Sequence, residues 1–198
     1  DDRTSRGLGD VYKRQVRGID LRQPLSDSDR DVLRTAMSRF AVLVFRGQPL
    51  SEDEHAAFTR RFGPSDAGLL LAAKRKARLS NPDVIDLANV DADGNVLPPE
   101  NLRNVSLIAN QLWHSDSSFK APAAKYSVLC GVDVPGDGGQ TEFADQRAAY
   151  EALDEGMKDR LAGLKAEHWA FHSRNMLGGA DFTQEGMEAL PPVWWPIV

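Results

Sequence analysis

Two segments near the start of the chain have apolar residues at helical spacing, and each is preceded by the same polar pattern. Ser26 is followed three residues later by Asp29, and Ser51 by Glu54. A serine and an acidic residue at this spacing satisfy the free amides at a helix N-terminus. The apolar positions that follow are Val32, Leu33, Ala36 and Met37 after the first pair, and Phe58 and Phe62 after the second. The sequence therefore predicts helices after Ser26 and Ser51, the second ending at Gly63-Pro64.

Short apolar runs between the helices predict strands. These runs are 16–21, 41–45, 84–90, 126–134, 140–144 and 164–171. Two more helices are expected, one after the cap Asp145 and one at 183–190. Alternation through 126–134 places Cys130 on the apolar face, in the core. No glycine fingerprint follows a strand to open a helix, which disfavours a doubly wound parallel sheet. We expect an α+β fold built on a largely antiparallel sheet or barrel.

Three stretches lack a clear period. Residues 1–15 are polar and rich in glycine and arginine, and we interpret them as a non-native scar segment ahead of one domain at 16–198. Residues 65–82 carry four basic side chains and predict a loop or lid that is solvated, with attraction of an anionic substrate as the alternative. The last residues, 193–198, include Trp194 and Trp195, whose apolar surface would be wet at a free end. They suggest a chain that is cut within the domain.

Composition and charge narrow the class of protein. The 198 residues carry 24 Lys plus Arg and 29 Asp plus Glu, a net charge of −5, and 41% are hydrophobic. This mild acidity, without a long basic run, argues against nucleic acid as a partner. No apolar stretch approaches the roughly 18 residues of a membrane span. One cysteine excludes an internal disulfide framework and a cysteine-rich metal site. A soluble, cytoplasmic protein is expected.

The chemistry concentrates at His114 and Asp116. Residues two apart on an extended backbone project to the same side, so the imidazole and the carboxylate can face one point. They would form two corners of the 2-His-1-carboxylate triad that binds Fe(II). The simpler interpretation is a surface histidine paired with an aspartate. The apolar neighbours Leu112, Trp113 and Phe119 favour a shielded setting, where a carboxylate needs a cation.

Thr141 is a second candidate. It follows Gly138-Gly139, which allow a tight turn, and its hydroxyl could donate to a ligand carboxylate. The alternative is a β-branched residue that serves only strand propensity.

Four segments carry a family resemblance: WHSDSSF, PAAKYSVL, GGQTEFADQRAAYEAL and, nearer the start, AVLVFRGQPLSEDEHAAFTRRFGP. Together they resemble the TauD/TfdA family of Fe(II)/2-oxoglutarate-dependent dioxygenases, and most closely its 2,4-dichlorophenoxyacetate (aryloxyalkanoate) branch. The resemblance implies a double-stranded β-helix, a jelly-roll or cupin-like fold with flanking helices, whose C-terminal strands are missing here. It also implies Fe(II), 2-oxoglutarate and O2, with ascorbate as an activator. The expected substrate is a small carboxylate-bearing molecule such as an aryloxyalkanoate, hydroxylated as succinate and CO2 are released.

Carried over by motif, His114 and Asp116 match two iron ligands, and Thr141 matches a contact to the 2-oxoglutarate carboxylate. The resemblance places Trp113 beside the cosubstrate, and Asn110 and Ser118 on the substrate side. The family's second histidine ligand and the arginine beyond it have no counterpart at the expected distance. We therefore predict that this chain alone is inactive.

The other histidines are not assigned to the metal. His168 and His172 follow Thr141 too soon, and His55 is interpreted as a solvated helix residue. Two alternative functions stay open: a taurine or alkylsulfonate dioxygenase of the same family, and a non-catalytic jelly-roll protein that binds a metal. A homo-oligomer of the full-length form is also left open.

Overall fold

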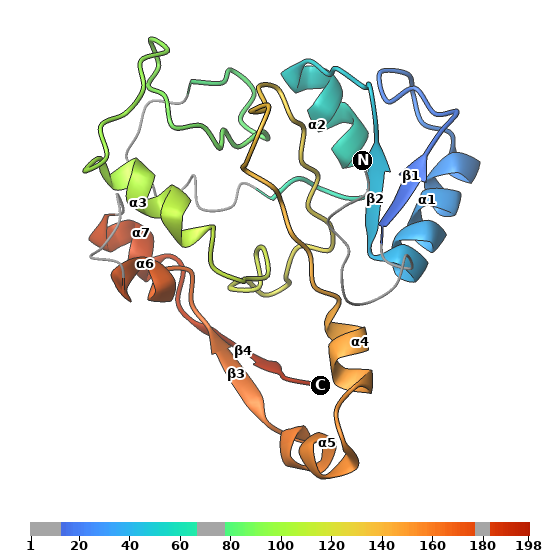
Figure 1. Cartoon of the computed structure of the whole chain (residues 1–198), viewed down its shortest axis with the longest axis vertical. Coiled ribbons are helices and arrows are strands. Elements are labelled where there is room, and N and C mark those ends of the chain that lie inside the picture. The colour runs from blue at the N-terminus through green and yellow to red at the C-terminus, as the bar shows by residue number, and fades with distance from the viewer. Residues whose placement is uncertain (1–12, 67–77, 177–182) are drawn as a thin grey trace. The chain divides into compact units, whose positions relative to one another are not determined.

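The computed structural model describes residues 13–66, 78–176 and 183–198. They divide into two compact units, each treated separately below. The first comprises Asp1–Gly63 and Val128–Arg160, and the second Pro64–Ser127 and Leu161–Val198. Figure 1 shows the order of the helices and strands along the chain.

The first unit begins with a parallel strand pair joined by a helix. β1 (Lys13–Val16) pairs with β2 (Val42–Phe45), and α1 (Asp27–Phe40) makes the connection (Figure 1). One prediction was wrong here, because the first strand covers 13–16 instead of 16–21. The pair is parallel, whereas the sheet as a whole was predicted to be largely antiparallel. The reason is the crossover through α1, which returns the chain in its original direction.

Both predicted helix starts are confirmed. The Ser26 hydroxyl accepts a hydrogen bond from the Asp29 amide at 3.0 Å. Ahead of α2 (Glu52–Arg60), the Ser51 hydroxyl accepts from the Glu54 amide, and the Glu54 carboxylate accepts from the Ser51 amide at 2.8 Å. This reciprocal pair satisfies two amides that the helix itself leaves without partners.

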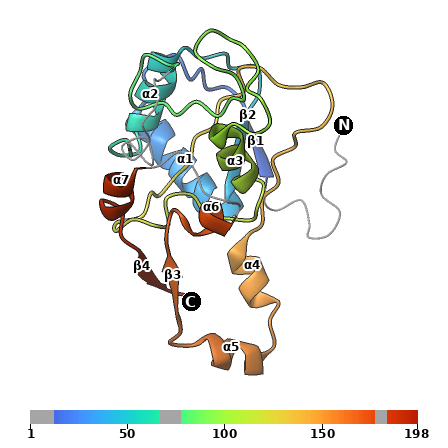
Figure 2. The same cartoon turned by 90° about the vertical axis from the view of Figure 1, so that its left-hand side faces the viewer.

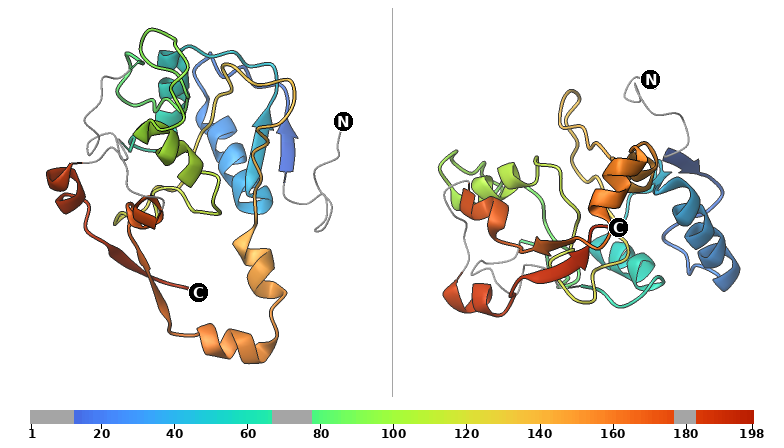
Figure 3. Two further views of the ribbon diagram at one scale, coloured as in Figure 1. Left: turned by 60° about the vertical axis from the view of Figure 1, so that its left-hand side comes forward. Right: turned by 90° about the horizontal axis from the view of Figure 1, so that it is seen from below.

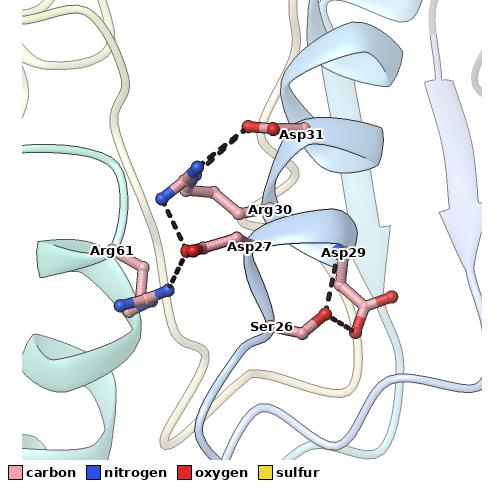
Figure 4. A network of polar contacts seen from close by, with 6 residues as sticks. All are labelled: Ser26, Asp27, Asp29, Arg30, Asp31 and Arg61. Atoms are coloured by element: carbon pink, nitrogen blue, oxygen red, sulfur yellow. Dashed lines mark hydrogen bonds and ion pairs between the residues drawn. The ribbon is translucent and has the colours of Figure 1, made fainter.

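Asp27 connects the two helices at the surface. Its carboxylate accepts from Arg30 in the same helix at 2.9 Å and from Arg61, the C-cap of α2, at 2.8 Å (Figure 4). Asp27 is largely exposed, so these ion pairs contribute little to stability. Their effect is to fix the start of α1 against the end of α2.

The core of the first unit forms around α1 and α2. Its buried residues are Leu21, Leu25, Leu33 and Phe58. Phe58 makes edge-to-face contacts with Phe45 at 5.8 Å and with Phe62 at 5.3 Å. Val32, which the helical period placed on the inner face, is 61% exposed. The unit closes with α4 (Gln146–Glu151), capped by Asp145 as predicted, and α5 (Glu155–Leu161).

Segments 126–134 and 140–144 are not strands in the part of the chain that the structure describes. Alternation holds from Tyr126 to Cys130, with half-buried residues between exposed ones, but Val132 and Val134 are 90% and 67% exposed. Cys130 is therefore half-buried and not in the core. Segment 84–90 also lacks a strand, although the turn that follows it closes with a single bridge between Val90 and Val96. Alternation specifies which side chains face inward, while a strand also needs a neighbouring backbone.

Among its described residues, the second unit holds an antiparallel pair and three helices. β3 (Lys165–His168) pairs with β4 (Val193–Pro196), with Ala166 opposite Trp195. α3 (Leu102–Ala109) lies against α6 (His172–Met176), as Figure 2 shows. α7 (Gln184–Glu188) lies within the predicted helix at 183–190, is capped by Thr183 and precedes β4 (Figure 3). The buried centre is Ala170 and Phe171, with Phe119 packed against it.

The fold prediction is confirmed at its coarse level. Helices and strands both occur, as an α+β class requires, but the sheets within the described ranges have two strands each. The double-stranded β-helix, the scar segment at 1–15 and the single domain at 16–198 stay predictions. Lys74, Arg75 and Lys76 of the expected loop lie outside the described residues. No helix among the described residues has the length and apolar character that a bilayer crossing requires.

Candidate metal-binding site

The segment that carries His114 leaves the end of α3. Asn101 caps the start of this helix by accepting from the Arg103 amide at 2.9 Å, and Asn110 is its C-cap. The chain then runs without regular structure to a turn that begins at Asp116. Ser117 in this turn has φ of 50°, a left-handed conformation that is uncommon for a residue with a Cβ atom. The histidine and aspartate therefore lie between a helix end and a tight turn.

His114 and Asp116 face one another, as their spacing predicted. His114 Nε2 lies 3.2 Å from Asp116 Oδ1. The other ring nitrogen, Nδ1, donates to the Leu112 carbonyl at 2.6 Å, because a carbonyl can only accept. In the neutral ring Nε2 then carries a lone pair, and this lone pair points at a carboxylate oxygen. Such an arrangement is favourable only with a cation between the two atoms, either a proton or a metal ion.

The spacing fits two neighbouring ligands of one metal ion. Ligand atoms at about 2.1 Å from a metal and at right angles to each other are about 3.0 Å apart. The observed 3.2 Å between Nε2 and Oδ1 is close to this value. The bond from Nδ1 to a carbonyl is also the usual way in which a ligating histidine is oriented. The donor set therefore fits a divalent metal.

The prediction that apolar side chains shield this pair was wrong. The side chains of His114 and Asp116 are 44% and 54% exposed. Leu112 and Trp113 are themselves 50% and 69% exposed. Phe119 alone of the three packs on the buried centre of the second unit. Solvent therefore reaches the carboxylate in the described structure, and burial does not explain a need for a cation.

The structure places the remaining predicted residues as follows. Asn110 and Trp113 are exposed on the same segment as His114, and Ser118 is half-buried in the turn after Asp116. The Ser118 hydroxyl donates to the Ser115 carbonyl at 3.2 Å. Thr141 belongs to the first unit, where it is exposed and outside any strand. Their roles toward a cosubstrate or substrate stay predictions.

A third ligand does not join the pair within the described ranges, where no group of three His, Cys, Asp or Glu side chains could hold a metal. His168 is half-buried in β3, and His172 is exposed at the start of α6. The prediction for His55 was wrong: this residue is half-buried in α2, and its Nε2 lies 3.1 Å from the Val128 carbonyl. Both atoms belong to the first unit, so His55 has a packing role.

One polar cluster near α3 was missed by the sequence analysis. Arg103 donates to the Val90 carbonyl at 2.8 Å and to the Asp86 carboxylate at 2.8 Å, while Arg78 donates to both Asp86 oxygens. The Arg78 guanidinium, with help from Arg103, holds the pKa of Asp86 below its ordinary value of 3.8 although burial acts to raise it. The cluster fixes the helix that leads into the His114 segment. The sequence contains no local signal for this cluster, because Asp86 lies 8 residues from Arg78 and 17 residues from Arg103.

Residues 4–198 match the family model described as taurine catabolism dioxygenase TauD, TfdA family. The chain therefore belongs to the TauD/TfdA family. This result confirms the family that the sequence motifs indicated.

Three similar proteins cover most of this chain. The alpha-ketoglutarate-dependent 2,4-dichlorophenoxyacetate dioxygenase of Cupriavidus pinatubonensis is 45% identical over 96% of this chain and 67% of its own length. The (S)-phenoxypropionate/alpha-ketoglutarate-dioxygenase of Delftia acidovorans is 33% identical over 92% of this chain and 62% of its own. The crystal structure of AAD-2 in complex with Mn(II) and N-oxalylglycine superposes with a TM-score of 0.79 at 34% identity, covering 98% of this chain and 66% of that one. The chain thus spans about two thirds of the length of these relatives.

Proposed function

We propose that this chain carries the His–Asp half of the metal site of an Fe(II)- and 2-oxoglutarate-dependent dioxygenase that hydroxylates an aryloxyalkanoate. The observation that carries the proposal is the convergence of His114 Nε2 and Asp116 Oδ1, with Nδ1 bonded to the Leu112 carbonyl. With a third protein ligand in place, three positions on the metal would be left for the two cosubstrate oxygens and O2. The jelly-roll fold and the cytoplasmic location belong to this proposal.

The similar proteins support both the metal and the cosubstrate. AAD-2 was crystallised with Mn(II) and N-oxalylglycine, which presents the same two carboxylates and the same chelating oxygen as 2-oxoglutarate. Identity favours the aryl branch: the Cupriavidus relative is 45% identical, against 30% for an alkylsulfatase of Acinetobacter baylyi. A non-catalytic metal-binding protein is disfavoured because these relatives are named as enzymes.

The residues of this chain would act by binding and orientation. His114 and Asp116 hold the metal on one side, and the Leu112 carbonyl keeps the imidazole turned toward it. Thr141 would donate its hydroxyl to the cosubstrate carboxylate, and Trp113 would lie beside the cosubstrate. Asn110 and Ser118 would face the substrate. The bound metal and cosubstrate supply the oxidising power that activates O2 toward a C–H bond.

A metal titration tests the proposal directly. We expect the chain to bind Mn(II), followed by electron paramagnetic resonance, and to bind it more tightly when N-oxalylglycine is present. His114→Ala and Asp116→Ala should each weaken binding by at least about 10-fold, since even losses around the ligands cost 10–100-fold. Asp116→Glu should also bind poorly, because the longer side chain displaces the carboxylate.

His168→Ala is the matched control, because it removes a histidine from β3 and leaves the pair intact. It should bind Mn(II) like the wild type. Equal binding by His114→Ala and the wild type would contradict the metal site and leave a protein of this family without the proposed chemistry.

A further inference from the structure

The turn that follows Asp116 is held by a residue from a distant part of the second unit. The indole Nε1 of Trp195, in β4, donates to the Ser118 carbonyl at 2.6 Å. The two residues are 77 positions apart in the sequence. A half-buried hydrogen bond between side chain and backbone fixes the orientation of the peptide that accepts it. Trp195 thereby fixes the peptide plane two residues beyond Asp116.

This turn needs such support. Ser117 has φ of 50°, a conformation that costs free energy for a residue with a Cβ atom and persists only when its surroundings impose it. Within the turn, the Lys120 amide donates to the Ser117 carbonyl at 3.3 Å, and the Ser118 hydroxyl donates to the Ser115 carbonyl at 3.2 Å. Both bonds are long, so the turn is weakly held by its own backbone.

Two other contacts hold the same turn. Phe119 packs against the buried pair Ala170 and Phe171, and Lys120 makes an ion pair with Asp66. Neither contact involves the Ser118 carbonyl directly. The indole bond is therefore the contact that sets the direction of the backbone next to Asp116.

The strand pair places the indole for this purpose. Trp195 lies opposite Ala166 in β3 and is half-buried, while its neighbour Trp194 lies opposite Glu167 and is 59% exposed. Adjacent residues of a strand point to opposite faces, so only one of the two tryptophans can reach the turn. The Ile197 amide donates to the Leu164 carbonyl at 3.0 Å and continues the pairing just beyond the strands.

We infer that Trp195 is a positioning residue for the metal site: its indole N–H holds the turn that presents Asp116 to the metal beside His114. The inference rests on the proposed function, because it gives Asp116 the role of a ligand. Its consequence is that removal of one N–H group, remote in sequence, weakens metal binding and changes the ligand geometry without changing any ligand.

The test compares Trp195→Phe with Trp194→Phe in the 198-residue chain. Trp195→Phe keeps an aromatic ring and removes the donor, whereas Trp194→Phe makes the same change on the exposed face. We expect Trp195→Phe to weaken Mn(II) binding by about 3- to 10-fold, the range for one hydrogen bond, and to shift the visible absorption bands of bound Co(II). Trp194→Phe should match the wild type in both measurements.

The outcomes separate the two proposals. Wild-type binding and an unchanged Co(II) spectrum in Trp195→Phe, with binding lost in His114→Ala, would overturn the inference and leave the proposed function intact. A wild type that binds no Mn(II) would overturn the proposed function and the inference with it.

If the Trp195→Phe variant does not fold, a second measurement on the wild type tests the inference. In the wild type, the indole N–H of Trp195 should exchange with solvent deuterium more slowly than that of Trp194, as followed by nuclear magnetic resonance. Equal exchange rates would show that the bond to Ser118 does not persist in solution, and the inference would be wrong.

Discussion

His114 shows how a single backbone atom can decide the chemistry of a side chain. Its Nδ1 donates to the Leu112 carbonyl, only two residues away, so the ring is oriented by its own segment. In the neutral ring, the lone pair on Nε2 then faces Asp116. A ring turned by 180° about its Cβ–Cγ bond would lose this carbonyl bond, and a second orientation is correspondingly disfavoured. The site is thus prepared for a cation before any ligand arrives.

At the same scale, Thr141 tests whether the first unit contributes to cosubstrate binding. Thr141→Val keeps the shape of the side chain and removes its hydroxyl. We expect 2-oxoglutarate to bind about 10- to 100-fold more weakly in the presence of Mn(II), because a hydrogen bond to a charged group contributes about 1.5–3 kcal/mol. Isothermal titration calorimetry measures this change. Thr141→Ser keeps the hydroxyl and should retain most of the affinity; equal affinity of Thr141→Val and the wild type would reduce Thr141 to a surface residue.

Asp86 provides a prediction about pH. Arg78 and Arg103 lower its pKa below 3.8, so the folded state favours the charged carboxylate. The stabilisation is therefore complete above pH 3.8 and is lost as the pH falls through the lowered value in the folded state. Asp86→Asn should reduce the free energy of unfolding by about 1–3 kcal/mol at neutral pH.

Urea unfolding of Asp86→Asn and the wild type at several pH values measures this difference. The gap between the two proteins should narrow below pH 3.8 and close as the pH falls through the lowered pKa of Asp86 in the folded state. Asp93→Asn, an exposed change in the nearby turn, should have little effect at any pH. A gap that stays constant through the acid range would mean that packing, and not charge, accounts for the loss.

At the scale of the element, α2 depends on its reciprocal cap. Ser51→Ala removes the acceptor for the Glu54 amide and should lower the free energy of unfolding by about 0.5–2 kcal/mol. Ser38→Ala is the matched control, because Ser38 lies inside α1 and its hydroxyl donates only to the Arg34 carbonyl one turn earlier. This control should be neutral. Thermal unfolding followed by circular dichroism separates the two, and equal melting temperatures would contradict the role of the cap.

The elements that sequence could predict are those whose signal is local. Ser26, Ser51 and Asp145 each cap a helix that begins at the next residue, and these three caps were predicted correctly. The helix at 183–190 was also predicted, and Thr183 caps it. α3 was missed although Asn101 caps it, because its apolar positions do not extend beyond two turns. Strands were predicted less well, since their existence depends on a partner that is distant in sequence.

The candidate site likewise combines features that the sequence could predict with features that it could not. The spacing of His114 and Asp116 was sufficient to predict that they face one point, because both lie on one short segment. Their exposure was not predictable, since it depends on what packs over Leu112 and Trp113. The bond from Trp195 to Ser118 could not be inferred either, because it depends on the register of β4 against β3.

At the scale of the whole molecule, the number of ligands limits activity. Within the described residues His114 and Asp116 have no third partner, and two ligands do not complete a facial triad. We expect the 198-residue chain to release no succinate from 2-oxoglutarate with Fe(II), ascorbate and 2,4-dichlorophenoxyacetate. The Cupriavidus relative, assayed in parallel, should release it. Substrate-dependent succinate formation by this chain would refute the two-ligand count and return His168 and His172 to consideration.

The parallel pairing of β1 with β2 has a consequence for how the first unit assembles. Lys13 pairs with Val42 across the whole of α1, so the pair forms only after the intervening chain has been brought back. Closing a loop costs entropy that grows with its length, and a helix shortens the distance that the chain must cover. A helix forms in about a microsecond, well before such non-local pairing. We therefore expect α1 to form before β1 and β2 pair.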